Sequence, residues 1–288
     1  MSGRPFKRMV VGLPQGMGNQ AAVQAAADLA ERLQIELLGA FIEDATLLEL
    51  AGFPAMRELR ALDQQWQPFD VERISRELES AAAMARKRFV EGAPPRSIKT
   101  AFDVLHNVDA IMSLIESGDI LTVIEPSHPG EAMTRQFAAL LDTAFATEGS
   151  ILAVPRRIAR NHGPIMALAS RPSDAGIRIG LEIAAALKER MIAVMPPGVE
   201  LPPEIIAEAK RLGVAIEQLA ANPNEHDAPS MTSRSKERLR IVTRSQLRSN
   251  PSQLFAILNG VPLLLVDSQE PSPAAAPIGN ASLKASSA

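Results

Sequence analysis

The sequence predicts an α/β fold of two tandem, doubly wound domains, each with a mostly parallel five-stranded sheet. Residues 7–44 show an apolar strand, a glycine-rich turn, an amphipathic helix and a second strand. Residues 164–195 repeat this order with elements of similar length. Apolar runs then alternate with helical patterns through both halves. Strands that alternate with helices require right-handed crossovers, which give parallel sheets covered by helices on both faces.

The composition excludes several functional classes. Among the 288 residues, 46% are hydrophobic but only 3% are aromatic, so two domains of ordinary size would have aliphatic cores. The net charge of −3 gives no broad basic surface for nucleic acid or anionic membranes. The absence of cysteine excludes disulfides, a thiol nucleophile and a thiolate metal site.

No stretch of the sequence suggests export or membrane insertion. No segment approaches the roughly 20 apolar residues that a helix needs to cross a bilayer. The first residues also lack an apolar run of signal-peptide length before the turn at Gly12–Pro14. We therefore expect a cytoplasmic protein with neither a membrane nor a nucleic acid as partner.

The first domain is expected over residues 1–157. Its strands are expected at residues 9–13, 35–42, 97–105, 120–124 and 151–154. The first helix has one apolar stripe, as in a helix that packs on a sheet: Ala22, Ala26, Leu29, Ala30 and Leu33. A long helix over residues 71–91 ends before Gly92 and two prolines.

Residues 44–69 are interpreted as a helical insertion after the second strand. Apolar residues recur there at roughly helical spacing, with a break at Gly52, which predicts one or two short helices. One interpretation is that these helices pack on the edge of the domain; the other is a lid or a protein-interaction surface. The candidate residues for such a partner surface are Leu47, Leu48, Phe53, Leu59 and Trp66.

A polar segment, residues 156–163, is the expected linker to a second, shorter domain over residues 163–267. Its strands are expected at residues 164–169, 191–195, 214–219, 239–243 and 261–266, and its helices at 173–189, 203–212 and 250–259. The basic segment 234–248 has no aromatic residue for base stacking, so a sheet edge or an intramolecular ion-pair surface is favoured over a nucleic-acid patch. Residues 268–288 are of low complexity and are expected to be disordered.

This order of elements resembles the universal stress protein family in tandem form. The residues that carry the resemblance are MVVGLPQGMGNQAAVQAAADLAERLQIELLGAFI (9–42), GSILAVP (149–155) and VPLLLVD (261–267). The resemblance covers residues 6–155 and, more faintly, 163–267. In single-domain relatives two protomers associate through their last strands. The resemblance therefore implies that strands 151–154 and 261–266 pair within this chain as an intrachain pseudo-dimer, with a homodimer of the whole chain as a further expectation.

The family's nucleotide-binding members carry an Asp after the first strand and a motif G-x2-G-x9-G-[S/T] after the fourth. The Asp can hold the adenine or ribose, while glycine amides and a helix N-terminus cradle phosphates. In this chain the Asp position falls on Pro14 in the first half and near Ser170 in the second. Ser127 stands at the first glycine of the motif, Gly130 can stand for the second, and the helix-start pair falls near Phe137–Ala138.

The corresponding segment of the second half, residues 243–253, contains no glycine. The resemblance therefore implies a degenerate, non-nucleotide-binding member without a cofactor. ATP or AMP would bind only through a site altered beyond sequence recognition.

The turn after the first strand offers a competing interpretation. Gly16 to Ala21 match G-x-G-x-x-A, and Glu43 and Asp44 end the second strand where a dinucleotide-binding fold places its ribose acid. The strand leaves at Gly12–Pro14, however, so the loop is too long for that geometry. A flexible turn with a helix start is favoured, with an anion at the helix N-terminus as the alternative. The candidate ligand residues here are Pro14, Gln15, Gly16, Gly18, Asn19 and Glu43.

The loop after the fourth strand adds Ser127, His128 and Gly130 as candidate ligand contacts, because α/β proteins bind ligands at the carboxyl edge of their sheets. A solvated loop is the competing interpretation. A Ser and a His next to each other in sequence give no evidence of a nucleophile–base pair, and the scattered histidines predict no metal site.

The sequence thus predicts a universal-stress-type regulatory or binding protein for a small ligand or a protein partner, without catalysis and without a standard ATP site. One alternative is a nucleotide-binding protein or nucleotide-using enzyme with a divergent site at the carboxyl edge of the first sheet. The other is an interaction module that uses residues 44–69.

Overall fold

The computed structural model describes residues 5–14, 20–43, 49–50, 53, 56–59, 64–68, 70–93, 97–221, 236–244, 254–255 and 257–267. The first half contains β1 (Arg8–Pro14), α1 (Gln20–Leu33), β2 (Glu36–Ile42), β3 (Arg57–Leu59), β4 (Trp66–Pro68), α3 (Val71–Gly92), β5 (Thr100–Leu105), α4 (Asp109–Leu114), β6 (Asp119–Ile124), α5 (Pro129–Ala132), α6 (Arg135–Ala146) and β7 (Ser150–Val154). The second half contains β8 (Ile165–Leu168), α7 (Ala175–Leu187), β9 (Met191–Met195), α8 (Pro203–Leu212), β10 (Ile216–Ala220), β11 (Leu239–Thr243) and β12 (Leu263–Val266).

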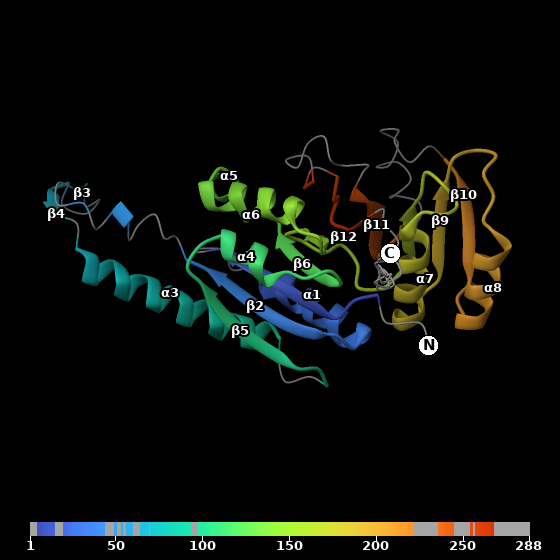
Figure 1. Cartoon of the computed structure of the whole chain (residues 1–288), viewed down its shortest axis with the longest axis horizontal. Helices are drawn as coiled ribbons and strands as arrows, with labels where there is room; N and C mark the ends of the chain where they lie inside the picture. The colour runs from blue at the N-terminus through green and yellow to red at the C-terminus, as the bar shows by residue number, and fades with distance from the viewer. Residues whose placement is uncertain are drawn as a thin grey trace, which may run out of the picture.

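One long sheet runs through both halves (Figure 1). In the described part of the chain it has ten strands in the order β10-β9-β8-β11-β12-β7-β6-β1-β2-β5. Its strand pairs are parallel except for the pair between β12 and β7. The expected α/β class with a mostly parallel sheet is confirmed.

Apolar side chains alternate between the two faces of the sheet and build a core on each. In β1, Met9 and Val11 face the core that includes α1 and α7, whereas Val10 faces the core that includes α4 and α6. Both cores continue from the first half into the second. Strands covered on both faces are near-continuous apolar runs, which is the pattern that the sequence shows.

β7 and β12 join the two halves. Their paired residues are Leu263 with Ala153, Leu264 with Leu152 and Leu265 with Ile151. All of these residues are buried. The expected pairing of the two last strands within the chain is therefore present.

Arg244 follows β11 and ties the second half to the first. The residue is 4% exposed, and its side chain donates hydrogen bonds to the carbonyl oxygens of Thr147, at 2.6 Å, and of Gly149. These carbonyls lie between the end of α6 and the start of β7, where backbone acceptors lack helical partners and a cation complements the helix dipole. A side chain of one half thus satisfies buried backbone groups of the other.

The described part of the basic segment, residues 236–244, lies largely inside the protein. Arg240 is 4% exposed and pairs with the fully buried Glu237 at 2.8 Å. Its guanidinium also donates to the carbonyl of Ile257 at 3.0 Å. Burial lowers the pKa of Arg240 from its ordinary value, and the Glu237 charge opposes this effect. Intramolecular ion pairs are therefore present in this segment, but they are largely buried rather than on a surface. The alternative of an exposed sheet edge is wrong, because β11 lies between β8 and β12.

The insertion differs from its predicted helical structure. Glu49 and Leu50 are helical, but β3 and β4 form an antiparallel hairpin that pairs Leu59 with Trp66. Figure 1 shows this hairpin beyond the N-terminal end of α3, away from the large sheet. The expectation of helices throughout 44–69 is therefore wrong for the hairpin residues. Apolar residues at roughly helical spacing do not distinguish a helix from strands when each strand has only three residues.

Two further expectations concern the end of the chain. The predicted helix over residues 250–259 is wrong where the structure describes it, since Leu254, Phe255 and residues 257 and 259–260 form turns. The tail 268–288, expected to be disordered, lies outside the described residues.

Replacing Arg244 with Met should destabilise the protein because the carbonyls of Thr147 and Gly149 would lose their donor inside the core. We expect the free energy of unfolding to fall by roughly 2–3 kcal/mol, as measured by urea denaturation. The exposed Arg135, changed to Met in the same way, should alter it by less than about 0.5 kcal/mol. Equal stability of the two variants would show that Arg244 does not join the halves.

Gly163 in the linker should be sensitive to the addition of a single methyl group. Its φ is +132°, and a Cβ would overlap with the carbonyl oxygen of Lys236. We expect Gly163→Ala to cost roughly 2–4 kcal/mol of unfolding free energy. Gly213→Ala is the matched control, because its φ is +70° but nothing lies within 4 Å of the added Cβ, so it should cost only about 1 kcal/mol. A larger loss at Gly213 would contradict this argument.

Candidate functional site

The carboxyl edge of the first half is the region that the sequence singles out. Because β1, β2, β6 and β7 are parallel, their carboxyl ends lie at the same edge. Pro14 ends β1 and is buried beside Ile42, its partner in β2. Gln15, Gly16, Gly18 and Asn19, the predicted ligand residues of the turn, lie outside the described residues, as does Asp44. The described part of the edge therefore consists of the residues after β2, β5, β6 and β7.

Glu43 is held in place by the end of β5. Its backbone N–H donates to the carbonyl of Leu105 at 2.8 Å. Its carboxylate lies 2.8 Å from Nδ1 of His106, a side chain that is 85% exposed while that of Glu43 is only 12% exposed. His106 was not among the predicted site residues, although its place at a strand end could have suggested it. The Glu43 side chain is thus largely buried, and its partner His106 is largely exposed to solvent.

The loop after β6 is closed on itself by Glu131. The backbone N–H of Ser127 donates to Oε2 of Glu131 at 2.6 Å. The backbone N–H of Glu131 in turn donates to Nδ1 of His128 at 3.2 Å. Because Nδ1 accepts, a neutral His128 carries its proton on Nε2, which lies 3.3 Å from Oε1 of Glu131. Gly130 allows this closure, since a Cβ there would lie 3.1 Å from Nδ1 of His128.

The start of α6 is also occupied by the chain itself. Thr134 is the N-cap, and its hydroxyl accepts the N–H of Phe137 at 3.2 Å. Phe137, which falls where the family motif would place a small residue, is 3% exposed and packs against Phe255 with ring centroids 5.7 Å apart. The side chain of Gln136 donates to the carbonyl of Ile42 at 2.7 Å. The N-terminus of α6 is thus capped by Thr134 and covered by Phe137, whereas phosphate binding would need free N–H groups there.

Glu125, directly after β6, forms a hydrogen bond with Arg156, which lies just after β7. Its Oε2 accepts the backbone N–H of Arg156 at 2.7 Å, and the Arg156 guanidinium donates to the carbonyl of Ser127. Ser127, His128 and Gly130 thus lie in one short loop, and their role as ligand contacts stays a prediction. The structure adds Glu131, which the sequence reasoning missed; an acid four residues after Ser127 on a helical turn was the available signal.

The second half also places a carboxylate at a helix start. Asp174 is the N-cap of α7 and accepts the N–H of Gly176 at 3.1 Å. Burial raises the pKa of Asp174 above its ordinary value of 3.8, although hydrogen bonds from the backbone of Gly176 and Ser170 oppose the shift. Ser170, near which the family's Asp position falls, forms a backbone hydrogen bond to Asp174. An Asp directly before a helical pattern was the sequence signal for this cap.

At both sheet edges, carboxylates of the chain accept backbone N–H groups of the chain, as Glu125, Glu131 and Asp174 do. The described residues contain no group of three or more His, Cys, Asp or Glu side chains that could hold a metal ion. They also contain no helix long and apolar enough to cross a membrane.

Comparisons with known proteins identify the fold. No protein-family model matches the chain, and no curated protein matches its sequence. A universal stress protein from Archaeoglobus fulgidus DSM 4304 aligns with 90% of this chain and 96% of its own, with a TM-score of 0.61 and 8% sequence identity. The chain has the universal stress protein fold. A functionally unknown protein from Pseudomonas aeruginosa PAO1 also aligns, over 91% of this chain and 93% of its own, with a TM-score of 0.47 and 14% identity.

The universal stress protein fold explains the layers and strand order but not the site. An alignment at 8% identity shows the fold alone and assigns no role to the side chains at the sheet edge. Their role in this chain therefore has to be argued from their own contacts.

The predicted partner surface is exposed where it is described. Phe53, Leu59 and Trp66 are 61%, 53% and 63% exposed, respectively. Leu47 and Leu48 lie outside the described residues. The hairpin is fastened to α3 by Arg73, which pairs with Glu58 of β3 and, at 2.6 Å, with Glu77. Leu59 and Trp66 are thus exposed to solvent on a hairpin that an ion pair links to α3, and the exposed Phe53 precedes this hairpin in the chain.

The raised pKa of Asp174 gives a testable pH dependence. The native state binds a proton at Asp174 more readily than the unfolded chain does, so the contribution of Asp174 to stability falls as pH rises from about 4 through the raised pKa. Asp174→Asn keeps a capping oxygen but does not ionise. Its unfolding free energy relative to the wild type should therefore increase between about pH 4 and pH 7, as followed by chemical denaturation.

Asp174→Ala is the matched control for this effect. It also removes the charge but loses the cap, so it should be less stable than Asp174→Asn by about 1 kcal/mol across the same range. A relative stability of Asp174→Asn that falls with pH would contradict the assignment.

Proposed function

We propose that this chain is a universal-stress-type regulatory protein that binds a small ligand or a protein partner, works without catalysis and has no standard ATP site. The observation that carries this proposal is the 2.6 Å hydrogen bond from the Ser127 amide to the Glu131 carboxylate. In a loop that cradles phosphates, such amides point to the ligand. In this chain the Ser127 amide donates to the Glu131 carboxylate instead of to a bound phosphate.

The charges at the same edge support the absence of a polyphosphate ligand. Glu43 follows β2, Glu125 follows β6, and Glu131 lies in α5, directly after the loop that follows β6. A triphosphate would have to displace Glu131 from the Ser127 amide and would then lie among carboxylates. Like charges brought together in a partly desolvated site repel each other by several kcal/mol.

The contacts of His128 support a role without catalysis. Nδ1 accepts from the Glu131 amide, and Nε2 faces the Glu131 carboxylate. A nucleophilic serine needs a base within hydrogen-bonding reach of its hydroxyl. Both ring nitrogens of His128 are engaged elsewhere, so Ser127 and His128 serve to shape the loop.

We expect purified protein to give no measurable heat of binding when titrated with ATP and Mg²⁺. Native mass spectrometry should show the chain without nucleotide. Glu131→Ala is the sensitised variant, because it frees the Ser127 amide and removes one negative charge; any ATP binding should be stronger in this variant than in the wild type. One retained nucleotide per wild-type chain would overturn the proposal.

A second candidate function is protein interaction through the β3–β4 hairpin. The observation that favours it is the exposure of Leu59 and Trp66 on this hairpin, which lies away from the large sheet (Figure 1), together with the exposure of Phe53. Aromatic side chains, tryptophan above all, contribute much of the binding energy when they fill a partner's pocket. The pairing of Glu58 with Arg73 holds the hairpin at the end of α3 in advance of binding.

The fluorescence of the protein should report on this hairpin alone, because the sequence has one Trp and no Tyr. We expect the emission of a solvated indole from the isolated chain, and a blue shift when a partner or a second copy covers Trp66. Trp66→Ala should abolish partner capture with little change in the melting temperature, since the side chain is largely exposed. A blue-shifted emission from dilute, monomeric protein would contradict the exposed position.

A further inference from the structure

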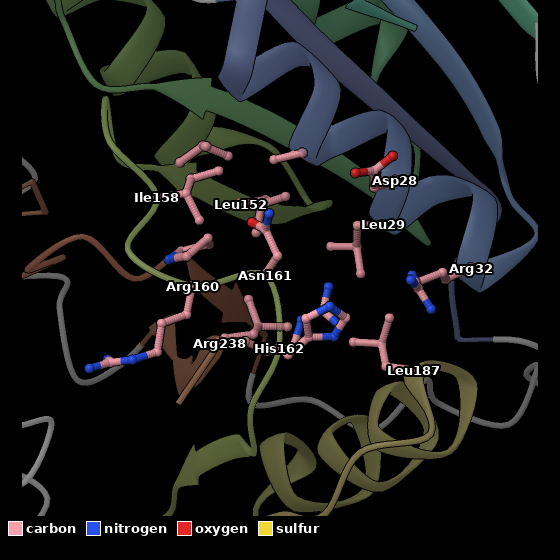
Figure 2. Close-up of a pocket in the computed structure, with 14 residues that line it drawn as sticks. Asp28, Leu29, Arg32, Leu152, Ile158, Arg160, Asn161, His162, Leu187 and Arg238 are labelled. Atoms are coloured by element: carbon pink, nitrogen blue, oxygen red, sulfur yellow. The ribbon is translucent and has the colours of Figure 1, made fainter. Parts of the chain in front are cut away.

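A pocket lies between the two halves, away from the carboxyl edge already described (Figure 2). Its volume is about 250 Å³. The first half contributes α1 and β7, and the second half contributes the end of α7 and the residues before β11 and β12. The linker residues 158 and 160–162 complete the lining. Neither half forms this pocket alone.

The wall of the pocket nearest the sheet is apolar. Its lining includes Leu29 of α1, Leu152 and Val154 of β7, Ile158 of the linker and Leu187 of α7. Leu29, Leu152, Val154 and Leu187 belong to the core that continues across the two halves. The pocket therefore opens where this core passes from the first half to the second, at the junction of α1, β7 and α7; this junction is called the seam below. The pocket has an apolar side formed by these residues beside a polar one.

Positive charge dominates the polar part of the lining. Among the described residues that line the pocket, Arg32, Arg160, Arg238 and His162 can carry positive charge, and Asp28 supplies the carboxylate. Figure 2 shows these side chains coming from α1, from the linker and from the segment before β11. Basic groups from three separate segments thus converge on one small space.

Arg238 is the central member of this set. Its side chain is only 13% exposed, and its Nη1 atom is buried without a hydrogen-bond partner among the described residues. Glu189 is the paired carboxylate, but its Oε1 lies 3.8 Å from Nη1, beyond hydrogen-bonding distance. The same oxygen accepts the backbone N–H of Gly163 at 3.2 Å and lies 3.8 Å from Nδ1 of His162. Glu189 is therefore shared among several donors.

The electrostatics around Arg238 agree with an excess of positive charge. Burial lowers its pKa, and the charge of Arg32 lowers it further, while Glu189 and Asp28 act in the opposite direction. A buried guanidinium with an unused donor is costly unless an acceptor is supplied. Guanidinium groups bind carboxylates and phosphates through two parallel hydrogen bonds.

We propose that the pocket between the halves binds a small organic anion, with its anionic group beside Arg32, Arg238 and His162 and its apolar body against Leu29, Leu152 and Leu187. The volume of about 250 Å³ is just below the range of pockets for drug-sized ligands, so the body is short. The proposal goes beyond the proposed function because it concerns a different site from the loop after β6. Since the lining comes from both halves, the anion would also stabilise their packing.

The test uses hexanoate as the probe, with 1-hexanol as its neutral counterpart and inorganic phosphate as an anion without an apolar body. We expect hexanoate to bind the full chain in isothermal titration and to raise its melting temperature, because a ligand of the native state stabilises it. Hexanol and phosphate should each bind at least tenfold more weakly. Equal binding of hexanol and hexanoate, or no binding of hexanoate, would overturn the proposal.

Charge variants locate the site. Arg32→Gln and Arg238→Gln should each weaken hexanoate binding about tenfold or more, because each removes a charged donor. Arg32 is exposed, so this variant tests the site even if Arg238→Gln folds poorly. Arg211→Gln on α8 is the matched control, because this exposed arginine pairs with Glu208 at 3.3 Å and does not line the pocket; it should leave binding unchanged. Loss of binding in the control, or unchanged binding in Arg32→Gln, would show that hexanoate binds elsewhere.

Discussion

The antiparallel pair of β7 and β12 is the interaction on which the rest of this molecule depends. Both strands are almost entirely buried, so neither can form an edge open to water. An unpaired edge would expose a row of N–H and C=O groups along an apolar strand. Pairing the two strands satisfies these groups and buries both apolar faces. The strands left at the edges, β5 and β10, are partly exposed and carry polar residues.

The same pairing creates the features that distinguish this chain from one isolated domain. It brings α1 and α7 into contact on one face of the sheet, and the pocket opens where they meet the linker. It also places Arg244 of the second half over the carbonyls that end α6. The halves are therefore joined by apolar contacts, which make both cores continuous, and by polar contacts such as that of Arg244.

Carboxylates and arginines are distributed unequally between the sheet edges and the seam. At the edges, Glu131 and Asp174 accept backbone N–H groups that an external anion could otherwise bind. At the seam, Arg238 is left with more donors than its neighbour Glu189 satisfies. The edge carboxylates thus satisfy backbone donors, whereas Asp28 and Glu189 between the halves leave Nη1 of Arg238 without a hydrogen bond. This contrast supports the proposed anion site between the halves.

The sequence by itself determined the α/β class and the order of most strands and helices. These two features depend on local periodicity and on runs of apolar residues that only a covered strand accommodates. The pairing of β7 with β12 was expected only from the resemblance to the universal stress protein family. It did not determine the hairpin at 57–68, because three-residue strands are too short for their period to be distinguished from a helical one. It suggested Ser127, His128 and Gly130 as neighbours, since they are close in the chain.

Only the tertiary structure decided which partners the polar side chains have. Arg244 and Thr147 are 97 residues apart in the chain, and no local pattern encodes their contact. The pocket likewise takes Arg32, His162 and Arg238 from segments that meet only when the two halves pair. The physical reason is that burial follows from the composition of each segment, whereas a hydrogen bond or an ion pair requires two particular atoms to be brought within a few ångströms by the whole fold.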